Sequence, residues 1–337
     1  MKIQEHFSLK AYNTFGIEAK AKLFSEVTSL ENLKEVYAHY SNEKKLPLGG
    51  GSNILLTKNF DGLVTKLNLL GKEVLKEDET HIWLKVGAGE VWHEFVLWAV
   101  ENGWSGVENM SLIPGSVGAA PMQNIGAYGV ELKDVFVELE AWLPEENTLE
   151  IFKNTACDFG YRSSIFKKHL KGKAIILNVT FKLSKQPKLN TSYGSIEDEL
   201  IAMHVSSPSI KDISDAVVRI RQSKLPNPAE IGNAGSFFKN PVVSIETVQD
   251  LLNKHPSAPN YKVGDNLYKV PAGWLIETAG WKGRTYDERF GIHKNQALVL
   301  VNYKNTLGQE IFDLSENIIE DIEDKFKIEL EREVNII

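Results

Sequence analysis

Hydrophobic and polar residues in the first seventy positions follow a strand period, then a helix period, then a strand period again. Residues 22–27 (KLFSEV) have the pattern of a strand. The capping box Thr28-x-x-Glu31 predicts the start of a helix that ends near Ser41. Residues 62–68 (GLVTKLN) predict another strand. This part of the chain is therefore expected to form a small α+β unit.

Between residues 72 and 184 the pattern changes to hairpins and longer strands around helices. Two strands are expected on either side of 78–80, a strand–turn–strand over 136–152, and a last strand over 174–183. A helix is expected over 90–103, with a glycine as its C-terminal stop. The apolar stripe of that helix consists of Trp92, Phe95, Val96, Ala99 and Val100.

The chain after residue 190 is richer in helices. Residues 209–224 have an amphipathic pattern that ends at Leu225-Pro226, and residues 306–326 carry apolar side chains at helical spacing. Residues 329–334 (ELEREV) alternate like a terminal strand, which puts three glutamates on one face. From the residues alone, these glutamates have the pattern of a solvated face. Residues 187–190 are the best candidate for a linker.

Length and charge narrow the possible partners. The chain has 337 residues, a formal net charge of −7 and one cysteine. Two or three domains are expected from this length. The acidic balance gives no reason to expect nucleic acid or a membrane as a partner, and the lack of an apolar leader pattern favours the cytoplasm. Cys157 is expected to be a small buried residue, since no histidine lies near it in the sequence.

Two glycine-rich loops are the strongest chemical signal in the sequence. They read PLGGGSNILL over 47–56 and GSVGAAPMQNIGAYG over 115–129. Successive glycines let backbone N–H groups turn toward a ligand. Neither loop contains lysine or arginine, so an anion there would be bound by peptide dipoles, as suits the pyrophosphate of a retained cofactor. The alternative is two tight turns.

Several common motifs are absent or incomplete. The sequence has no G-x-x-x-x-G-K-[ST] loop, and the G-x-G at Gly87 and Gly89 is followed by Trp92 where a dinucleotide fingerprint needs glycine. His93-Glu94 begins like a zinc-protease motif, but Leu97 stands where the second histidine belongs. The eight histidines are scattered, so no metal is expected.

Two further segments carry candidate chemistry. In DFGYRSSIFK (158–167), Asp158 is expected to cap a helix whose first turn holds Tyr161 and Arg162. Arginine is unfavourable at a helix N-terminus, so Arg162 is either a solvated side chain or an anion ligand. In GNAGSFFKNP (232–241), Ser236 is either a plain turn serine or a proton donor, and no G-x-S-x-G elbow surrounds it.

These segments, in this order, resemble the UDP-N-acetylenolpyruvoylglucosamine reductase family of peptidoglycan synthesis. The resemblance runs through nearly the whole chain: the two glycine loops, Tyr161-Arg162, KLPNP, GNAGSFFKNP, PAGWLIETAG and the terminal ELEREV. It implies an α+β fold with a two-lobed FAD-binding region of the vanillyl-alcohol-oxidase type and a separate α+β substrate-binding domain. The implied bounds are 1–68 and 69–186 for the two FAD lobes, 187–325 for the substrate-binding domain, and 326–337 for a C-terminal strand.

The resemblance also implies the site residues. Arg162, Ser236 and Glu333 match the family's catalytic positions. Contacts with noncovalent FAD are implied for Gly49, Gly50, Gly51, Ser52, Asn53, Gly115, Ser116, Gly118, Asn124, Gly126, Ala127 and Tyr128. Substrate contacts are implied for Tyr161, Tyr193, Lys224, Asn240, Tyr261, Lys282 and Gln296. One departure from the family pattern is Asn335, where relatives carry arginine.

The implied reaction is the NADPH-dependent reduction of UDP-N-acetylglucosamine enolpyruvate to UDP-N-acetylmuramate through enzyme-bound FAD. The partner implied is a small nucleotide sugar, and the chain is expected to be a monomer. Two alternatives remain open. One is an FAD-dependent oxidase of the same fold, which would share the glycine loops. The other is a nucleotide-sugar-binding protein without catalysis.

Overall fold

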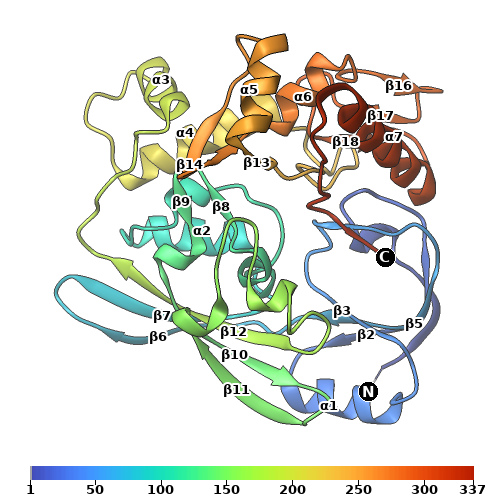
Figure 1. Cartoon of the computed structure of the whole chain (residues 1–337). Coiled ribbons are helices and arrows are strands. Elements are labelled where there is room, and N and C mark those ends of the chain that lie inside the picture. The colour runs from blue at the N-terminus through green and yellow to red at the C-terminus, as the bar shows by residue number, and fades with distance from the viewer. Residues whose placement is uncertain (1) are drawn as a thin grey trace. The chain divides into compact units, whose positions relative to one another are not determined.

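The structure is a computed structural model that describes residues 2–337 (Figure 1). The chain divides into two compact units. Unit 1 contains the described residues up to Phe7, together with Ala21–Gly50 and Asp61–Ser223. Unit 2 contains Ser8–Lys20, Gly51–Phe60 and Lys224–Ile337. These packing units differ in their bounds from the four expected domains, and the domain bounds stay a prediction.

The first sheet of unit 1 confirms the α+β pattern of the first seventy residues. Its strand order is β1-β2-β5-β3, and β3 runs parallel to β5. The bounds are β1 (Gln4–Ser8), β2 (Lys20–Val27), β5 (Phe60–Leu67) and β3 (Lys45–Leu48). Helix α1 (Leu30–His39) buries Leu33, Val36 and Tyr37 in a cluster with Leu63 and Leu67 of β5.

The predicted start of α1 was wrong by one residue. Ser29, not Thr28, is the N-cap, because its hydroxyl oxygen accepts a hydrogen bond from the Asn32 N–H at 3.1 Å. Ser29 has an extended backbone, as an N-cap residue should. The helix ends at His39, just before the expected Ser41.

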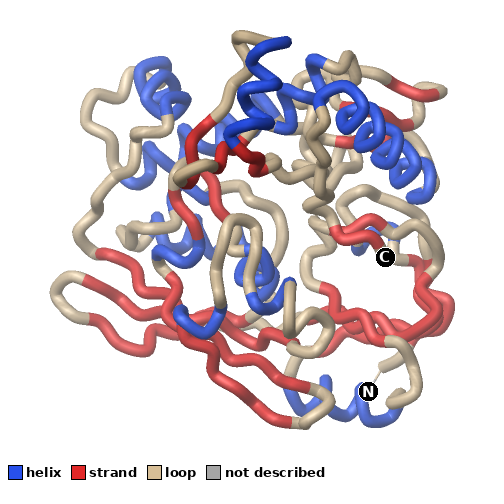
Figure 2. Tube along the Cα trace, viewed as in Figure 1, coloured by secondary structure: helices blue, strands red, loops and turns tan. Residues whose placement is uncertain are grey.

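The second sheet of unit 1 has five antiparallel strands in the order β11-β10-β12-β7-β6. Figure 2 shows them as one strand layer. The bounds are β6 (Lys72–Glu77), β7 (His81–Gly87), β10 (Phe136–Leu143), β11 (Thr148–Lys153) and β12 (Ile175–Ser184). All five agree with the strands that the sequence predicts.

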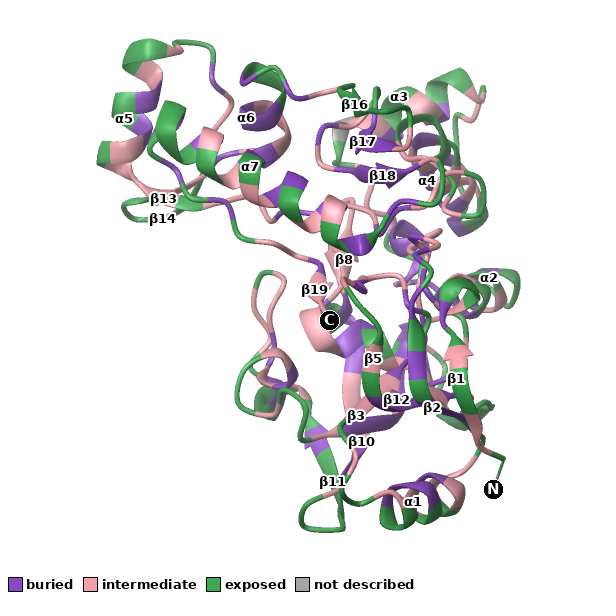
Figure 3. Ribbon diagram, turned by 90° about the vertical axis from the view of Figure 1, so that its right-hand side faces the viewer, coloured by how far each residue is buried: buried purple, intermediate pink, exposed green. Residues whose placement is uncertain are grey.

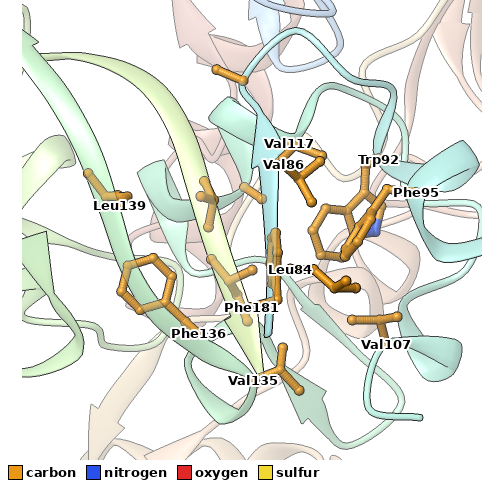
Figure 4. Packing of buried hydrophobic residues seen from close by; sticks show 14 of the residues in the cluster. Leu84, Val86, Trp92, Phe95, Val107, Val117, Val135, Phe136, Leu139 and Phe181 are labelled. Atoms are coloured by element: carbon orange, nitrogen blue, oxygen red, sulfur yellow. The ribbon is translucent and has the colours of Figure 1, made fainter. Parts of the chain in front are cut away.

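Helix α2 (Trp92–Glu101) supplies the apolar stripe that the sequence predicts for it. Its Trp92 and Phe95 pack against Phe181 of β12, with ring centroids 6.0 and 4.7 Å from that ring (Figure 4). Leu84 and Val86 of β7 belong to the same buried cluster. This cluster is the main core of unit 1.

Cys157 belongs to that core, as predicted. Its side chain is fully buried, and burial raises the pKa of its thiol to about 12. A thiol with so high a pKa is a poor nucleophile at neutral pH.

Two further helices and a short hairpin complete unit 1. The hairpin pairs β8 (Gly126–Ala127) with β9 (Val130–Glu131). Helices α3 (Gly194–Ala202) and α4 (Ile210–Lys224) share a small buried cluster of their own. The amphipathic pattern over 209–224 is therefore confirmed as a helix.

Unit 2 contains three small sheets and three α-helices. The antiparallel sheets are β13 (Val242–Ser244), β15 (Leu267–Lys269) and β14 (Tyr261–Gly264), and then β16 (Thr285–Tyr286), β17 (Phe290–Ile292) and β18 (Leu300–Asn302). The helices are α5 (Ile245–Lys254), α6 (Ala272–Thr278) and α7 (Gly308–Phe326). Buried residues recur along α7, as its predicted apolar stripe requires (Figure 3).

The terminal segment corrects one prediction. Residues 329–334 are not a regular strand, because only Arg332 forms a bridge, to Phe238. The predicted alternation is right for the apolar face, since Ile328, Leu330 and Val334 are buried. The strand that does form is β19 (Asn335–Ile336), which runs parallel to β4 (Ile54–Leu55).

Within residues 2–337, no helix is both long enough and apolar enough to span a membrane.

Candidate active site

The two glycine-rich loops meet in unit 1. The first follows β3, and a Cβ built on Gly50 would lie 2.8 Å from the Cα of Gly115. A Cβ on Gly49 would lie 2.6 Å from the Ser116 hydroxyl oxygen. Side chains at these positions would force the loops apart, so the glycines are required by the close approach of the two backbones.

A lysine lies beside the first loop, although the loop sequence itself contains none. The Lys66 ammonium, on β5, donates a hydrogen bond to the Gly49 carbonyl oxygen at 2.9 Å. Burial lowers the pKa of Lys66, and the negative charge of Glu26 acts in the opposite direction. That peptide dipoles bind an anion at these loops stays a prediction, and the structure adds a lysine ammonium beside the first loop. The signal in the sequence was a single lysine within the apolar strand pattern of 62–68.

The second loop is folded by its own polar side chains. After the 3₁₀ helix Val117–Gln123, which contains Gly118, Asn124 adopts a left-handed backbone with φ 45°. Its side-chain oxygen accepts from the Lys133 N–H at 3.0 Å, and its amide donates to the Gly160 carbonyl at 3.3 Å. The expected cofactor residues Gly126 and Ala127 form β8 directly after it.

Arg162 lies in a tight turn and not in a helix, which corrects the sequence prediction. Asp158 is itself left-handed, with φ 46°, and ends a 3₁₀ turn instead of capping a helix. Gly160 and Ser163 then exchange backbone hydrogen bonds of 3.0 and 3.2 Å across Arg162, whose own φ is 51°. A positive φ is uncommon for arginine, so the neighbouring contacts must hold this backbone in place.

The Arg162 side chain is directed to the second glycine loop. Its guanidinium donates to the Gly126 carbonyl at 3.0 Å, and Ser164 donates to the Met122 carbonyl at 2.7 Å. The neighbouring Tyr161 is exposed, with the guanidinium carbon 5.8 Å from its ring centroid. The structure thus brings the predicted catalytic arginine to the predicted cofactor loop.

Two predicted ligand tyrosines of unit 1 also meet. The rings of Tyr128 and Tyr193 are 5.6 Å apart and nearly perpendicular. Burial raises the pKa of Tyr128, whereas Tyr193 is 55% exposed. An exposed tyrosine ring held against a second ring is suited to covering a ligand.

In unit 2 the structure brings together the segments that carry Ser236 and Glu333. The Glu333 N–H donates to the Phe237 carbonyl at 2.8 Å, and the Lys239 N–H donates to the Glu331 carbonyl at 2.9 Å. Residues 237–239 and 331–333 are therefore paired segments, which places the two predicted catalytic residues at their adjoining ends. Both side chains are half-buried.

The first loop continues into unit 2 and ties down the segment that carries Glu333. The Asn53 amide donates to the Glu333 carbonyl at 3.2 Å. The backbone N–H and the side-chain amide of Asn335 donate to the Asn53 carbonyl at 3.1 and 2.9 Å. Ser52 precedes this contact and is half-buried. Gly51 has φ 63°, and a Cβ there would lie 2.0 Å from the Tyr12 carbonyl oxygen.

Three predicted substrate residues line one cavity of unit 2, with a volume of about 480 Å³. They are Lys224, Asn240 and Gln296. The cavity is also lined by Trp274 and Glu277 of α6. The Ala272 N–H donates to the Asn240 side-chain oxygen at 2.9 Å, which fixes this amide at the start of α6.

The two remaining predicted substrate residues are not among those that line this cavity. Tyr261 is the first residue of β14 and is 60% exposed. Lys282 follows α6, and its ammonium lies 2.8 Å from a Glu277 carboxylate oxygen. Sequence reasoning missed Glu277, although its spacing from Gly273 and Trp274 would put the three residues on one helix face.

Comparison with known proteins assigns two parts of the chain to known domain families. Residues 21–151 match the family described as FAD binding domain, and residues 227–337 match the C-terminal domain of UDP-N-acetylenolpyruvoylglucosamine reductase. The UDP-N-acetylenolpyruvoylglucosamine reductase of Flavobacterium johnsoniae is 53% identical, with 100% of each chain covered. That of Amoebophilus asiaticus is 50% identical, again over 100% of each chain.

The fold is similar to that of a solved structure. The crystal structure of the UDP-N-acetylenolpyruvylglucosamine reductase from Thermus caldophilus has a TM-score of 0.69 and covers 100% of this chain and 99% of that chain at 24% identity. The fold and the matched domains define an FAD-dependent oxidoreductase with an α+β fold and a separate C-terminal domain. Its full-length relatives are more specific: the chain belongs to the UDP-N-acetylenolpyruvoylglucosamine reductase family.

The residues of the two loops fit the FAD that the family implies. The glycines leave the backbone bare where the loops meet, and the Lys66 ammonium lies behind Gly49. Both features suit a bound pyrophosphate. Among residues 2–337, no group of three or more His, Cys, Asp or Glu side chains is arranged to hold a metal ion.

Proposed function

We propose that Arg162, Ser236 and Glu333 carry the family's reaction in this chain, the reduction of UDP-N-acetylglucosamine enolpyruvate to UDP-N-acetylmuramate with FAD and NADPH. The single observation that supports the assignment is the pairing of residues 237–239 with 331–333, because it brings together the two backbone segments that carry Ser236 and Glu333. The family's place in peptidoglycan precursor synthesis comes with membership.

FAD, when bound, supplies hydride transfer, and the loops 49–53 and 115–128 would hold it. The side chains of this chain then bind the substrate and transfer a proton to it. Arg162 binds the enolpyruvyl carboxylate, because negative charge spreads into that carboxylate as the double bond is reduced, and a fixed guanidinium stabilises it.

Ser236 delivers the proton to the substrate carbon next to the carboxylate. A hydroxyl is a weak acid, so it must be placed where charge develops and must be protonated again afterwards. Glu333 assists when it is protonated, since a bare carboxylate would repel the dianion. Lys224, Asn240 and Gln296 of unit 2 bind the nucleotide sugar in the cavity that they line. Tyr193, Tyr261 and Lys282 are proposed to contact the same ligand.

The localisation, oligomeric state and partners of the protein are part of the same proposal. We infer a cytoplasmic monomer that acts on a small nucleotide sugar and does not bind nucleic acid or membranes. The net charge of −7 supports the absence of these two partners, since a negatively charged protein is repelled by nucleic acid and by anionic membrane surfaces. Size-exclusion chromatography with light scattering would test the monomer: a stable dimer would contradict it.

The proposed function is tested by an experiment in the absence of oxygen. The purified protein is reduced with NADPH, UDP-N-acetylglucosamine enolpyruvate is added, and the flavin absorbance is followed. Return of the yellow colour without oxygen is the expected result. A flavin that stays bleached until air enters would identify an oxidase, and a colourless protein that binds the nucleotide sugar would identify a binding protein without flavin.

A further inference from the structure

An acidic side chain lies in the cavity that is proposed to hold an anionic ligand. Glu277 lines it together with Lys224, Asn240 and Gln296. A carboxylate near a diphosphate is unfavourable by simple electrostatics. The position of Glu277 therefore needs a reason.

The partner of Glu277 is one of the predicted substrate residues. The Lys282 ammonium is 2.8 Å from the Glu277 carboxylate oxygen, as a hydrogen bond and an ion pair. Their side chains are 30% exposed for the lysine and 56% for the glutamate. An ion pair this exposed contributes little to folding, so its function is to be sought at the site.

The local structure explains how the pair forms. α6 is fixed at its start by the Ala272 hydrogen bond to Asn240, and Glu277 lies in its last turn. The chain then turns through Gly280 and Gly283, which have φ 87° and 77°. Lys282 lies in this turn, from which its side chain reaches back to the helix.

The ion pair limits where the ammonium can go. A lysine side chain has a flexible stem of four methylene groups and loses substantial conformational entropy when it is fixed. One of its three N–H donors is used by Glu277, which leaves two for a ligand. A lysine already held at the cavity costs less to order when the ligand arrives.

We propose that Glu277 is a positioning residue, which holds the Lys282 ammonium at the edge of the cavity so that it meets the diphosphate of the nucleotide sugar. This rests on the proposed function of the cavity. In the bound state the charge of Lys282 is shared between Glu277 and the diphosphate.

The probe is UDP, and its dissociation constant is measured by calorimetry on the FAD-loaded full chain. The variants are Glu277→Gln, Lys282→Met and the double substitution. Glu277→Gln is expected to weaken UDP binding about twofold to fivefold, the range of an exposed charge pair. In the Lys282→Met background the same substitution is expected to have no effect, because there is no ammonium left to hold. Glu277→Asp should recover part of the loss.

Two controls distinguish a positioning role of Glu277 from a general effect of its charge and from an effect on folding. Glu288→Gln also removes one negative charge, from a side chain that is 89% exposed, and is expected to leave UDP binding unchanged. Glu277→Gln is expected to melt at the same temperature as the parent protein. A lower melting temperature, with equal loss of UDP binding in both lysine backgrounds, would indicate a structural role and overturn the proposal.

Tighter UDP binding by Glu277→Gln also overturns the proposal, because the carboxylate then only repels the ligand and does not position the lysine. If the parent protein binds no UDP, or Lys224→Ala and Lys282→Met leave binding unchanged, the cavity assignment itself fails. If those two variants weaken binding while Glu277→Gln does not, only the role of Glu277 fails.

Discussion

At the scale of single residues, the site depends on backbones and charges that local sequence rules disfavour. Arg162 has a positive φ, which the turn between Gly160 and Ser163 imposes on it. Lys66 is a charged residue within an apolar strand, and its ammonium is satisfied by the Gly49 carbonyl. Exceptions of this kind are expected where a residue serves a ligand more than the fold.

Lys66 is predicted to strengthen FAD binding. Lys66→Met removes the hydrogen bond to Gly49 and a positive charge behind the loop, so the dissociation constant for FAD should rise roughly tenfold. The quenching of flavin fluorescence on addition of FAD to the apoprotein measures it. Lys44→Met removes the same charge from an exposed position of unit 1 and serves as the control. Equal effects of the two substitutions would show a general electrostatic effect only.

Ser236 is predicted to act only in the second half of the reaction. Ser236→Ala should leave reduction of the flavin by NADPH nearly unchanged and should slow its reoxidation by substrate roughly 100- to 10,000-fold, as expected for a lost proton donor. Stopped-flow absorbance separates the two steps. Ser257→Ala, at an exposed serine of unit 2, should change neither. Equal slowing of both steps by Ser236→Ala would exclude the role of proton donor.

At the scale of elements, amphipathic patterns account for most of the packing. α1 buries Tyr37 against Trp142 of the five-stranded sheet, with ring centroids 5.2 Å apart. α2 buries Trp92 and Phe95 against Phe181 of β12. For α2, the helix stripe predicted by the sequence is the face that packs on a sheet.

Burial of Tyr37 is predicted to make unit 1 sensitive to alkali. Burial raises the pKa of Tyr37 to about 12 from the usual 10.0, so the folded state retains a proton that the unfolded state releases. This stabilisation is fully present below about pH 10 and is lost as the pH rises through about 12. Tyr37→Phe should therefore flatten the fall in the free energy of unfolding between pH 10 and 12, measured by urea denaturation. An unchanged pH slope would show that Tyr37 does not titrate in this way.

The core between α2 and the five-stranded sheet is predicted to be sensitive to cavities. Phe181 is fully buried, so Phe181→Ala should lower the free energy of unfolding by about 3–5 kcal/mol. Chemical denaturation followed by circular dichroism measures the loss. The neighbouring Lys182 is exposed, and Lys182→Ala should cost less than about 1 kcal/mol. Similar losses for both would contradict the packing described.

At the scale of the whole molecule, unit 2 is assembled from three separate stretches of chain. The first stretch contributes Phe15, which is fully buried and lies 6.2 Å from the ring of Phe237. The Asn302 amide donates to the Phe15 carbonyl at 2.8 Å. The second stretch contributes β4, which pairs with β19 near the C-terminus. The segment after residue 224 is therefore only part of a folding unit.

A fragment of residues 224–337 is predicted not to fold alone. It lacks the apolar side chains of the first two stretches and the partner strand of β19, so its core would be exposed to water. Circular dichroism during thermal melting should show no cooperative transition, whereas the full chain should melt cooperatively. A cooperative transition in the fragment would show that the N-terminal stretches are dispensable.

The sequence by itself determined the elements that have a clear local period of hydrophobic residues. It predicted the helix over 90–103, the strands of the five-stranded sheet and the two glycine loops, and its motif order identified the family. It was wrong about Asp158, because a left-handed backbone at Asp158 and Arg162 depends on contacts with the second glycine loop that local rules do not include.

Only the tertiary structure decided which residues meet. Residues 237–239 and 331–333 are paired across nearly a hundred positions, and Asn53 contacts Glu333 across 280. Lys66 reaches Gly49 because β5 runs parallel to β3, and Glu277 reaches Lys282 because two glycines turn the chain back. Hydrophobic periodicity sets the local structure of a segment, but pairing between distant segments is set by the packing of the whole unit.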